Sequence, residues 1–213
     1  MLSGCREDPD TTANWEHSYS GLFDAEISNG GRFAIVSSFN EGASFWDLVE
    51  NSRLYDWRHN DSDDGQVSHI AFAPDSSHVI TADARTFVVW NLETGRSTGY
   101  WSIDSDITDV AISNHAAYAL LGLKDGRAIH VDQKTGRRLE VIAHRNERVV
   151  RVDLATDGLT APTGGNDGRV IIWNTITGSE VHVMEHEARV VIVTFDPSQQ
   201  RLFSVDEWGG AII

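Results

Sequence analysis

The sequence repeats itself, and this repeat constrains the fold more than any other feature. Several segments run from a turn through a short β-branched stretch to an aromatic residue, which Asp or Asn follows. Successive steps from Trp46 are 44, 41 and 42 residues long and lead to Trp90, Val131 and Trp173. A fifth unit begins near Ala188. Such a period corresponds to one supersecondary unit that must stack on its neighbours to bury its faces.

Within each period, short segments alternate apolar and polar residues, which is typical of half-buried strands. Four antiparallel strands in ~40–45 residues make one propeller blade. We therefore expect an all-β fold, a β-propeller of four-stranded antiparallel blades, with about five blades in this chain. The fourth unit shows four strand-like runs, at 149–154, 159–163, 169–174 and 180–184. The expected units cover approximately 18–58, 65–102, 105–142, 147–185 and 188–213.

The dipeptides Trp46-Asp47, Trp90-Asn91 and Trp173-Asn174 occupy equivalent places in their units. They resemble the signature pair of the WD-repeat β-propellers, and the resemblance extends over residues 12–213. The third unit departs from the pattern, because Val131 stands where the others carry Trp.

The resemblance implies a buried relay in each blade that links His, Ser or Thr, Asp and Trp. An indole N–H buried without an acceptor is costly, and a hydrogen-bonded relay removes that cost. The fourth unit matches in full, and the other units match in part. The fourth unit offers His144, Thr163, Asp167 and Trp173, and the first unit offers His17, Ser38 and Trp46. The second unit offers Thr81, Asp83 and Trp90, and His59 is the nearest histidine but does not match the pattern convincingly. The fifth unit offers His186 and Ser204, which an irregular Asp206-Glu207-Trp208 follows.

Residues 12–17 resemble 181–186, the outer strand of the fourth unit. Propellers of this family close their ring by lending such an N-terminal strand to the last blade. Two alternatives follow: a five-bladed ring, or part of a seven-bladed ring. The regular step places the next Trp at position 214, which favours the second alternative.

Leu2-Ser3-Gly4-Cys5 resembles the lipobox of bacterial lipoproteins, in which the Cys is acylated. Residues 1–11 would then form a lipid-bearing N-terminus and tether. Arg6 is not Asp, and by resemblance this favours the outer membrane, with the protein facing the periplasm. The alternative is a cytoplasmic protein, because the basic and apolar regions of a signal peptide are missing before Cys5.

The composition excludes several classes of function. Lys plus Arg number 17 against 32 for Asp plus Glu, a net charge of −15 that repels phosphate backbones, so nucleic acid is not an expected partner. Cys5 is the single cysteine, which excludes a disulfide framework. No nucleophile elbow or phosphate-binding loop occurs, so we expect no enzyme, no cofactor and no metal. One alternative stays open: an enzyme or ligand-binding propeller whose central channel gathers carboxylates or histidines from several blades.

Two acidic loops and one tryptophan are candidates for binding a protein partner. Trp208 falls in a turn, has no counterpart in the other units, and would be exposed like other interface anchors. The acidic pairs are Asp63 with Asp64, in a segment whose spacing also resembles that of a calcium loop, and Asp104 with Asp106. The leading hypothesis is a non-enzymatic protein-interaction scaffold, anchored through Cys5 and binding its partner on the loop rim.

Overall fold

The computed structural model describes residues 21–59 and 66–213. Within these residues the fold is all-β, and one short 3₁₀ turn, η1 (Asn114–Ala116), is the sole helical element. Four sheets contain four antiparallel strands and a fifth contains three. The expected all-β architecture of antiparallel blades, about five in number, is confirmed.

Each sheet is built from strands that follow one another along the chain. Blade 1 contains β1 (Leu22–Ile27), β2 (Phe33–Ser38), β3 (Ala43–Asp47) and β4 (Ser52–Trp57). Blade 2 contains β5 (His69–Phe72), β6 (His78–Ala82), β7 (Thr86–Asn91) and β8 (Ser97–Ser102). Blade 3 contains β9 (Ile107–Ile112), β10 (Tyr118–Leu123), β11 (Arg127–Asp132) and β12 (Arg138–Ile142). Blade 4 contains β13 (Val149–Val152), β14 (Thr160–Gly165), β15 (Arg169–Asn174) and β16 (Glu180–Glu185). Blade 5 contains β17 (Val190–Phe195), β18 (Leu202–Asp206) and β19 (Ala211–Ile212).

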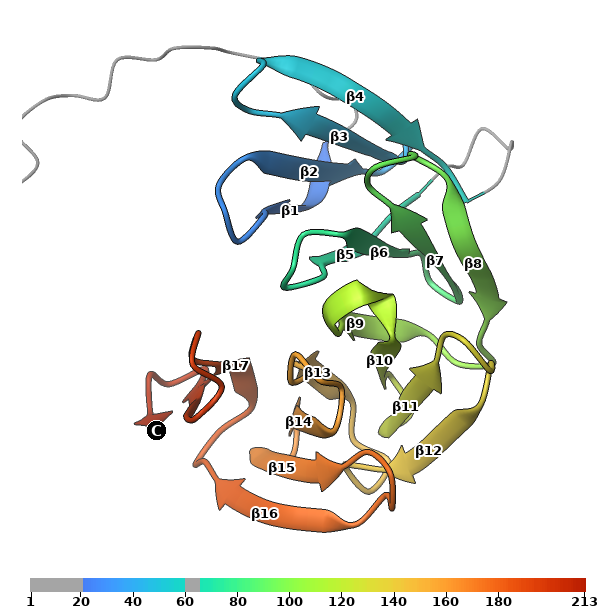
Figure 1. Ribbon diagram of the computed structural model, residues 1–213. Helices are drawn as coiled ribbons and strands as arrows, with labels where there is room; N and C mark the ends of the chain where they lie inside the picture. Colours follow the sequence, from blue (N-terminus) through green and yellow to red (C-terminus); the bar gives the residue numbers. More distant parts are fainter. Residues whose placement is uncertain (1–20, 60–65) are drawn as a thin grey trace, which may run out of the picture.

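The blades follow one another around an arc that does not close (Figure 1). The first strand of each blade faces the centre of the arc, and in blades 1 to 4 the fourth strand lies at the circumference. Blades 1 and 5 stand at the two ends of the arc.

The hydrophobic core lies between blades rather than within them. One cluster of buried side chains joins each pair of consecutive blades, so that four clusters serve four junctions. At the junction of blades 1 and 2, the rings of Trp57 and Trp90 stack with centroids 5.1 Å apart. The apolar face of each blade is thus buried by its neighbour, as the repeat requires.

Two glycines allow consecutive blades to approach closely. A Cβ at Gly122 would lie 2.8 Å from Val149 Cγ1, and a Cβ at Gly164 would lie 2.6 Å from Val190 Cγ1. Both distances are shorter than carbon atoms tolerate. The two glycines occupy the same place in their blades, so this close approach is itself part of the repeat.

Candidate functional site

The relay of blade 4 is complete. Nδ1 of His144 lies 2.8 Å from Asp167 Oδ1, and its Nε2 lies 3.0 Å from Thr163 Oγ1. The indole N–H of Trp173 donates to the same Thr163 oxygen over 3.0 Å. Burial pushes the pKa of Asp167 upward, but the hydrogen bond and charge of His144, together with the backbone N–H and charge of Arg169, outweigh it, so this pKa lies below its ordinary value. The carboxylate therefore stays ionised and orients the imidazole.

The order hydroxyl, imidazole and carboxylate is also that of a catalytic triad. His144 and Thr163 are both 0% exposed, however, so no substrate can reach the hydroxyl. The Thr163 oxygen already accepts the indole N–H of Trp173. The relay stabilises the blade, and we assign it no catalytic role.

Blades 2 and 5 have relays that the sequence pattern left incomplete. His59 is the relay histidine of blade 2: its Nε2 lies 2.8 Å from Thr81 Oγ1, which also accepts the Trp90 indole N–H at 2.8 Å. This histidine was unconvincing from the sequence pattern, yet it precedes His144 by 85 residues, which is two periods.

In blade 5, His186 Nε2 lies 2.8 Å from Ser204 Oγ. Its Nδ1 lies 3.4 Å from Asp206 Oδ2. Asp206 therefore serves as the relay acid, despite the irregular turn that follows it. The relay Asp stands two residues after the hydroxyl residue in blades 2 and 5 but four residues after it in blade 4, and in blade 5 this difference hid the match.

Blade 1 differs from the prediction. The indole N–H of Trp46 donates to Ser44 Oγ over 2.7 Å, whereas Ser38 Oγ bonds to the backbone of its own turn. Ser44 lies two residues before Trp46 on the same strand, so it reaches the indole without crossing the sheet. His17 lies outside the described residues, as do Cys5, Asp63 and Asp64.

Blade 3 has replaced its relay with apolar residues. Ile103, Leu121 and Val131 occupy the places of His, Thr and Trp, and they are 6%, 0% and 0% exposed. All three belong to the cluster between blades 2 and 3. The acid remains as Asp125, which pairs with Arg127 at 2.8 Å instead.

The acidic residues of the predicted docking loop are engaged by the chain's own cations. Arg127 lies 2.6 Å from Asp104, while Arg85 and Lys124 lie 3.1 and 3.2 Å from Asp106. The hydrogen bond from Arg127 lowers the pKa of Asp104, and that from Arg85 lowers the pKa of Asp106. A basic partner would have to displace these cations, which weakens the case for a docking patch at this loop.

Trp208 lies in the turn between β18 and β19 and is 74% exposed. Its backbone N–H donates to Asp206 Oδ1 over 3.0 Å, which fixes the turn. Blade 5 has three strands in the described chain and stands at one end of the arc. A partner-binding role for Trp208 stays a prediction.

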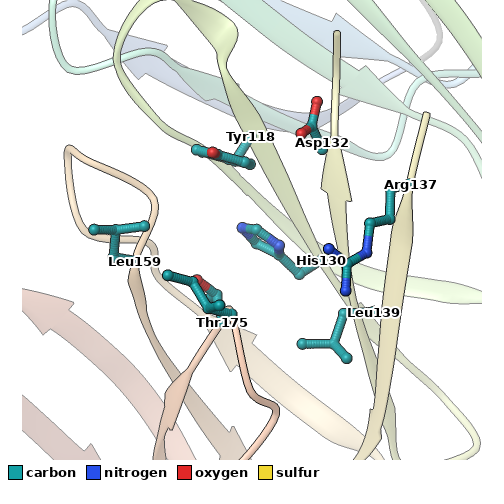
Figure 2. A pocket seen from close by; sticks show the side chains of 8 residues that line it. Tyr118, His130, Asp132, Arg137, Leu139, Leu159 and Thr175 are labelled. Carbon is teal, nitrogen blue, oxygen red and sulfur yellow. The ribbon is translucent and has the colours of Figure 1, made fainter. Parts of the chain in front are cut away.

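A crevice opens where blade 3 meets blade 4, with a cavity volume of ≈ 120 Å³ (Figure 2). We call it the 3–4 crevice. Figure 2 shows the His130 ring in its middle, with Arg137 and Leu139 on one side and Leu159 and Thr175 on the other. Its remaining lining residues are Tyr118, Asp132 and Ile176.

The floor of the 3–4 crevice is fixed by hydrogen bonds and stacking. Nε2 of His130 lies 3.1 Å from the carbonyl oxygen of Gly158, and its ring stacks on Tyr118 with centroids 4.9 Å apart. Burial lowers the pKa of His130, so the imidazole is neutral at pH 7. The hydroxyl of Thr175 donates to the same carbonyl over 2.7 Å.

The mouth of the 3–4 crevice combines apolar and charged groups. Leu159 and Ile176 are 39% and 63% exposed. Arg137 is exposed and forms no ion pair with any other described residue. None of these residues was a candidate from the sequence. One signal was present: His130 stands where the other complete blades carry Phe45, Val89 and Ile172.

The radial sheets define the structural class, a β-propeller, and the His–Thr–Trp relays resemble those of WD repeats. Residues 53–91 match the family model described as WD domain, G-beta repeat. This segment runs from the outer strand of blade 1 to the third strand of blade 2. The predicted WD-repeat resemblance is thereby confirmed.

A solved structure with the same fold is the β-propeller domain of Cps50 (Swd1) from Myceliophteria thermophila. The TM-score is 0.76 at 10% sequence identity, and the match covers 89% of this chain. It covers 64% of that chain, so the present chain spans less than two thirds of it. No curated protein matches the sequence.

Neither a metal centre nor a membrane-spanning helix occurs in the part of the chain that the structure describes. No group of three or more His, Cys, Asp or Glu side chains there is arranged to hold a metal ion. No helix in the same residues is long and apolar enough to cross a membrane.

Proposed function

We propose that this protein is a non-catalytic protein-interaction scaffold and that a partner peptide docks in the 3–4 crevice. The fold supports the general role, because propellers present rigid loop rims to partners. The observation that carries the site is an unpaired guanidinium, Arg137, beside the exposed apolar side chains of Leu159 and Ile176.

The position of the crevice supports this choice over Trp208. It lies between two complete four-stranded blades in the middle of the arc. Its exposure therefore does not depend on what stands beside the ends of the arc, whereas that of Trp208 does.

The lining favours one kind of segment. An aliphatic side chain would fill the space between Leu139 and Leu159, and a carboxylate next to it would pair with Arg137. The stacked Tyr118 and His130 rings offer a flat wall to the peptide. We expect segments in which Leu, Ile or Val adjoins Asp or Glu.

Selection from a random peptide library displayed on phage tests this proposal. Peptides selected on the wild type should be enriched in an aliphatic residue next to an acidic one. Their binding should fall at least tenfold on Arg137→Ala and on Leu159→Asp, and persist on Trp208→Ala. If peptide binding is lost only in the Trp208→Ala variant, the binding site is the turn that carries Trp208. The absence of any enriched motif among the selected peptides would contradict docking in the crevice.

We further propose that the chain is anchored to a membrane through a lipid on Cys5, as in outer-membrane lipoproteins that face the periplasm. The lipobox-like residues 2–5 support this. Two or three acyl chains on one Cys would hold a globular domain firmly. Fractionation of cells expressing the wild type and Cys5→Ser tests the anchor: the variant should leave the membrane fraction, and identical fractionation would reject the anchor in favour of a cytoplasmic scaffold.

A further inference from the structure

The strands that face the centre of the arc bring together charged residues from blades 1, 3 and 4 and a histidine from blade 2. Two successive inward positions run through β1, β5, β9, β13 and β17, because alternate residues of a strand share one face. The first position holds Asp24, His69, Asp109, Arg151 and Ile192. The second holds Glu26, Ala71, Ala111, Asp153 and Thr194.

Most of these carboxylates reach from one blade to the next. Glu26 accepts the N–H of Phe72 over 2.8 Å, and Asp153 accepts that of Phe195 over 2.7 Å. An innermost strand is the edge of its sheet and would otherwise present unpaired N–H groups to the channel. Glu26 and Asp153 therefore have a structural role.

At the first inward position the residues also enclose a cavity of ≈ 440 Å³, which we call the channel cavity. Asp24 and Asp109 each keep one hydrogen bond to the next blade, with the N–H of Ile70 and of Val152. The guanidinium of Arg151 donates to the backbone carbonyl of Val150, the residue before it in the chain, over 3.1 Å. The full lining is Phe23, Asp24, Ser68, His69, Asp109 and Arg151.

Charges of both signs thus face one space without pairing. Neither Asp24 nor Asp109 forms an ion pair with Arg151 or with any other cation among the described residues. Asp24 and Asp109 are half-buried and Arg151 is exposed, so the two carboxylates are partly desolvated without a cation beside them, which carries a cost. A ligand that carries a cation and an anion a few ångströms apart would satisfy both sides at once.

We propose that the channel cavity binds a small zwitterion of the free α-amino acid class. The ammonium group lies between Asp24 and Asp109, and the carboxylate pairs with the guanidinium of Arg151. The Ser68 hydroxyl and the neutral His69 imidazole supply further polar contacts, and Phe23 borders the site. This site lies in the channel and is independent of the 3–4 crevice, so either can fail without the other.

The proposal also predicts how affinity depends on pH. Burial raises the pKa of Asp109 to about 7, although the Val152 N–H and the charge of Arg151 stabilise its anion. The ammonium binds the ionised form, so affinity for an amino acid should rise by up to about tenfold between pH 6 and pH 8. The other charged or titratable groups that face Asp109 are Asp24 and Glu26 on β1, His69 on β5, Arg151 on β13, and Asp153, which follows β13 directly.

Isothermal titration of the wild-type chain with free L-amino acids, beginning with L-alanine, L-serine, L-lysine and L-glutamate, tests the proposal. For the amino acid that binds best, the amine that lacks its carboxylate and the acid that lacks its ammonium should each bind at least tenfold more weakly. This comparison needs no variant, so it remains decisive if a variant fails to fold. Absence of binding by every free amino acid, or equal binding of an analogue with one charge, would overturn the proposal.

Matched variants then locate the site. Asp109→Asn and Arg151→Gln should each weaken binding at least tenfold. Glu187→Gln and Arg96→Gln remove the same charges from exposed positions outside the cavity and should leave affinity unchanged. Equal losses in the control variants, or none in the cavity variants, would show that the zwitterion binds elsewhere.

Discussion

At the scale of single residues, the buried His, Thr and Trp positions of the relay change together between blade 4 and blade 3. Blade 4 retains His144, Thr163 and Trp173 in one hydrogen-bonded chain. Blade 3 has exchanged all three for apolar residues, and none of these polar members was left behind. Physical chemistry explains this choice, because a partly satisfied polar network is worse than an apolar core.

Thr163→Val should therefore destabilise the protein out of proportion to its small change in volume. The substitution leaves the Trp173 indole N–H and the His144 imidazole buried without their shared partner. We expect a loss of about 1–3 kcal/mol in the free energy of unfolding, measured by urea denaturation. The control is Leu121→Val at the equivalent place in blade 3, where no hydrogen bond is lost. An effect of Thr163→Val below about 0.5 kcal/mol would contradict the role of the relay.

The pH dependence of stability should reveal Asp109. Its pKa is raised from 3.8 to about 7 by burial, so the folded protein holds a proton that the unfolded chain releases. This group therefore lowers stability as pH rises from about 4 to about 7. Asp109→Asn keeps an oxygen for the Val152 N–H and removes the ionisation. Between pH 5 and pH 8, the free energy of unfolding of the variant should therefore rise by about 1–3 kcal/mol relative to that of the wild type.

Thermal unfolding across this pH range measures the effect, and Glu187→Gln provides the control. Parallel profiles for Asp109→Asn and the wild type would contradict the raised pKa.

At this scale the sequence predicted the relay of blade 4 in full, because its residues lie at the spacing of the family pattern. His59 was discounted although its spacing of two periods from His144 pointed to it. Asp24, Asp109 and Arg151 were not singled out as one site, because each comes from a different blade and nothing local in the sequence relates them.

At the scale of strands and turns, periodicity predicted the strands and chain geometry decided their ends. The runs expected at 169–174 and 180–184 correspond to β15 (Arg169–Asn174) and β16 (Glu180–Glu185). The run expected at 149–154 ends earlier, at Val152, and β13 pairs with β14 through a register shift between Val149 and Arg151. Such irregularities depend on the neighbouring strand and cannot be predicted from one segment.

Gly164→Ala should disturb the packing of β14 against blade 5. The new Cβ would lie 2.6 Å from Val190 Cγ1, so the blades would have to move apart. We expect a loss of about 1–3 kcal/mol in the free energy of unfolding, measured by chemical denaturation. Gly136→Ala is the control for adding a methyl group in open space, although its positive φ carries a small cost of its own. A Gly164→Ala variant as stable as the wild type would show that blades 4 and 5 are less tightly packed.

At the scale of the whole molecule, the repeat predicted the propeller architecture because blades bury their faces only against one another. The ends of the arc depart from this rule. Blade 1 exposes Leu22 and Ile27 to 55% and 62%, and blade 5 exposes Phe203 to 37%. Apolar faces of this kind are sites of association.

The 213-residue chain should therefore self-associate at micromolar concentration. Light scattering coupled to size exclusion measures the mass, and Phe203→Asp should shift the population toward monomer. A sharp monomer for the wild type would contradict association through the ends of the arc.

The central claim is that each junction between blades is a shared core, and hydrogen exchange tests it most directly. Ile171 is 0% exposed and belongs to the cluster that blades 3 and 4 share. In Ile171→Ala, mass spectrometry should find faster amide exchange in β10 and β11 of blade 3 as well as in β14 and β15 of blade 4, while blade 1 keeps its protection. Faster exchange confined to blade 4 would contradict the claim, because it would mean that the blade buries its core alone.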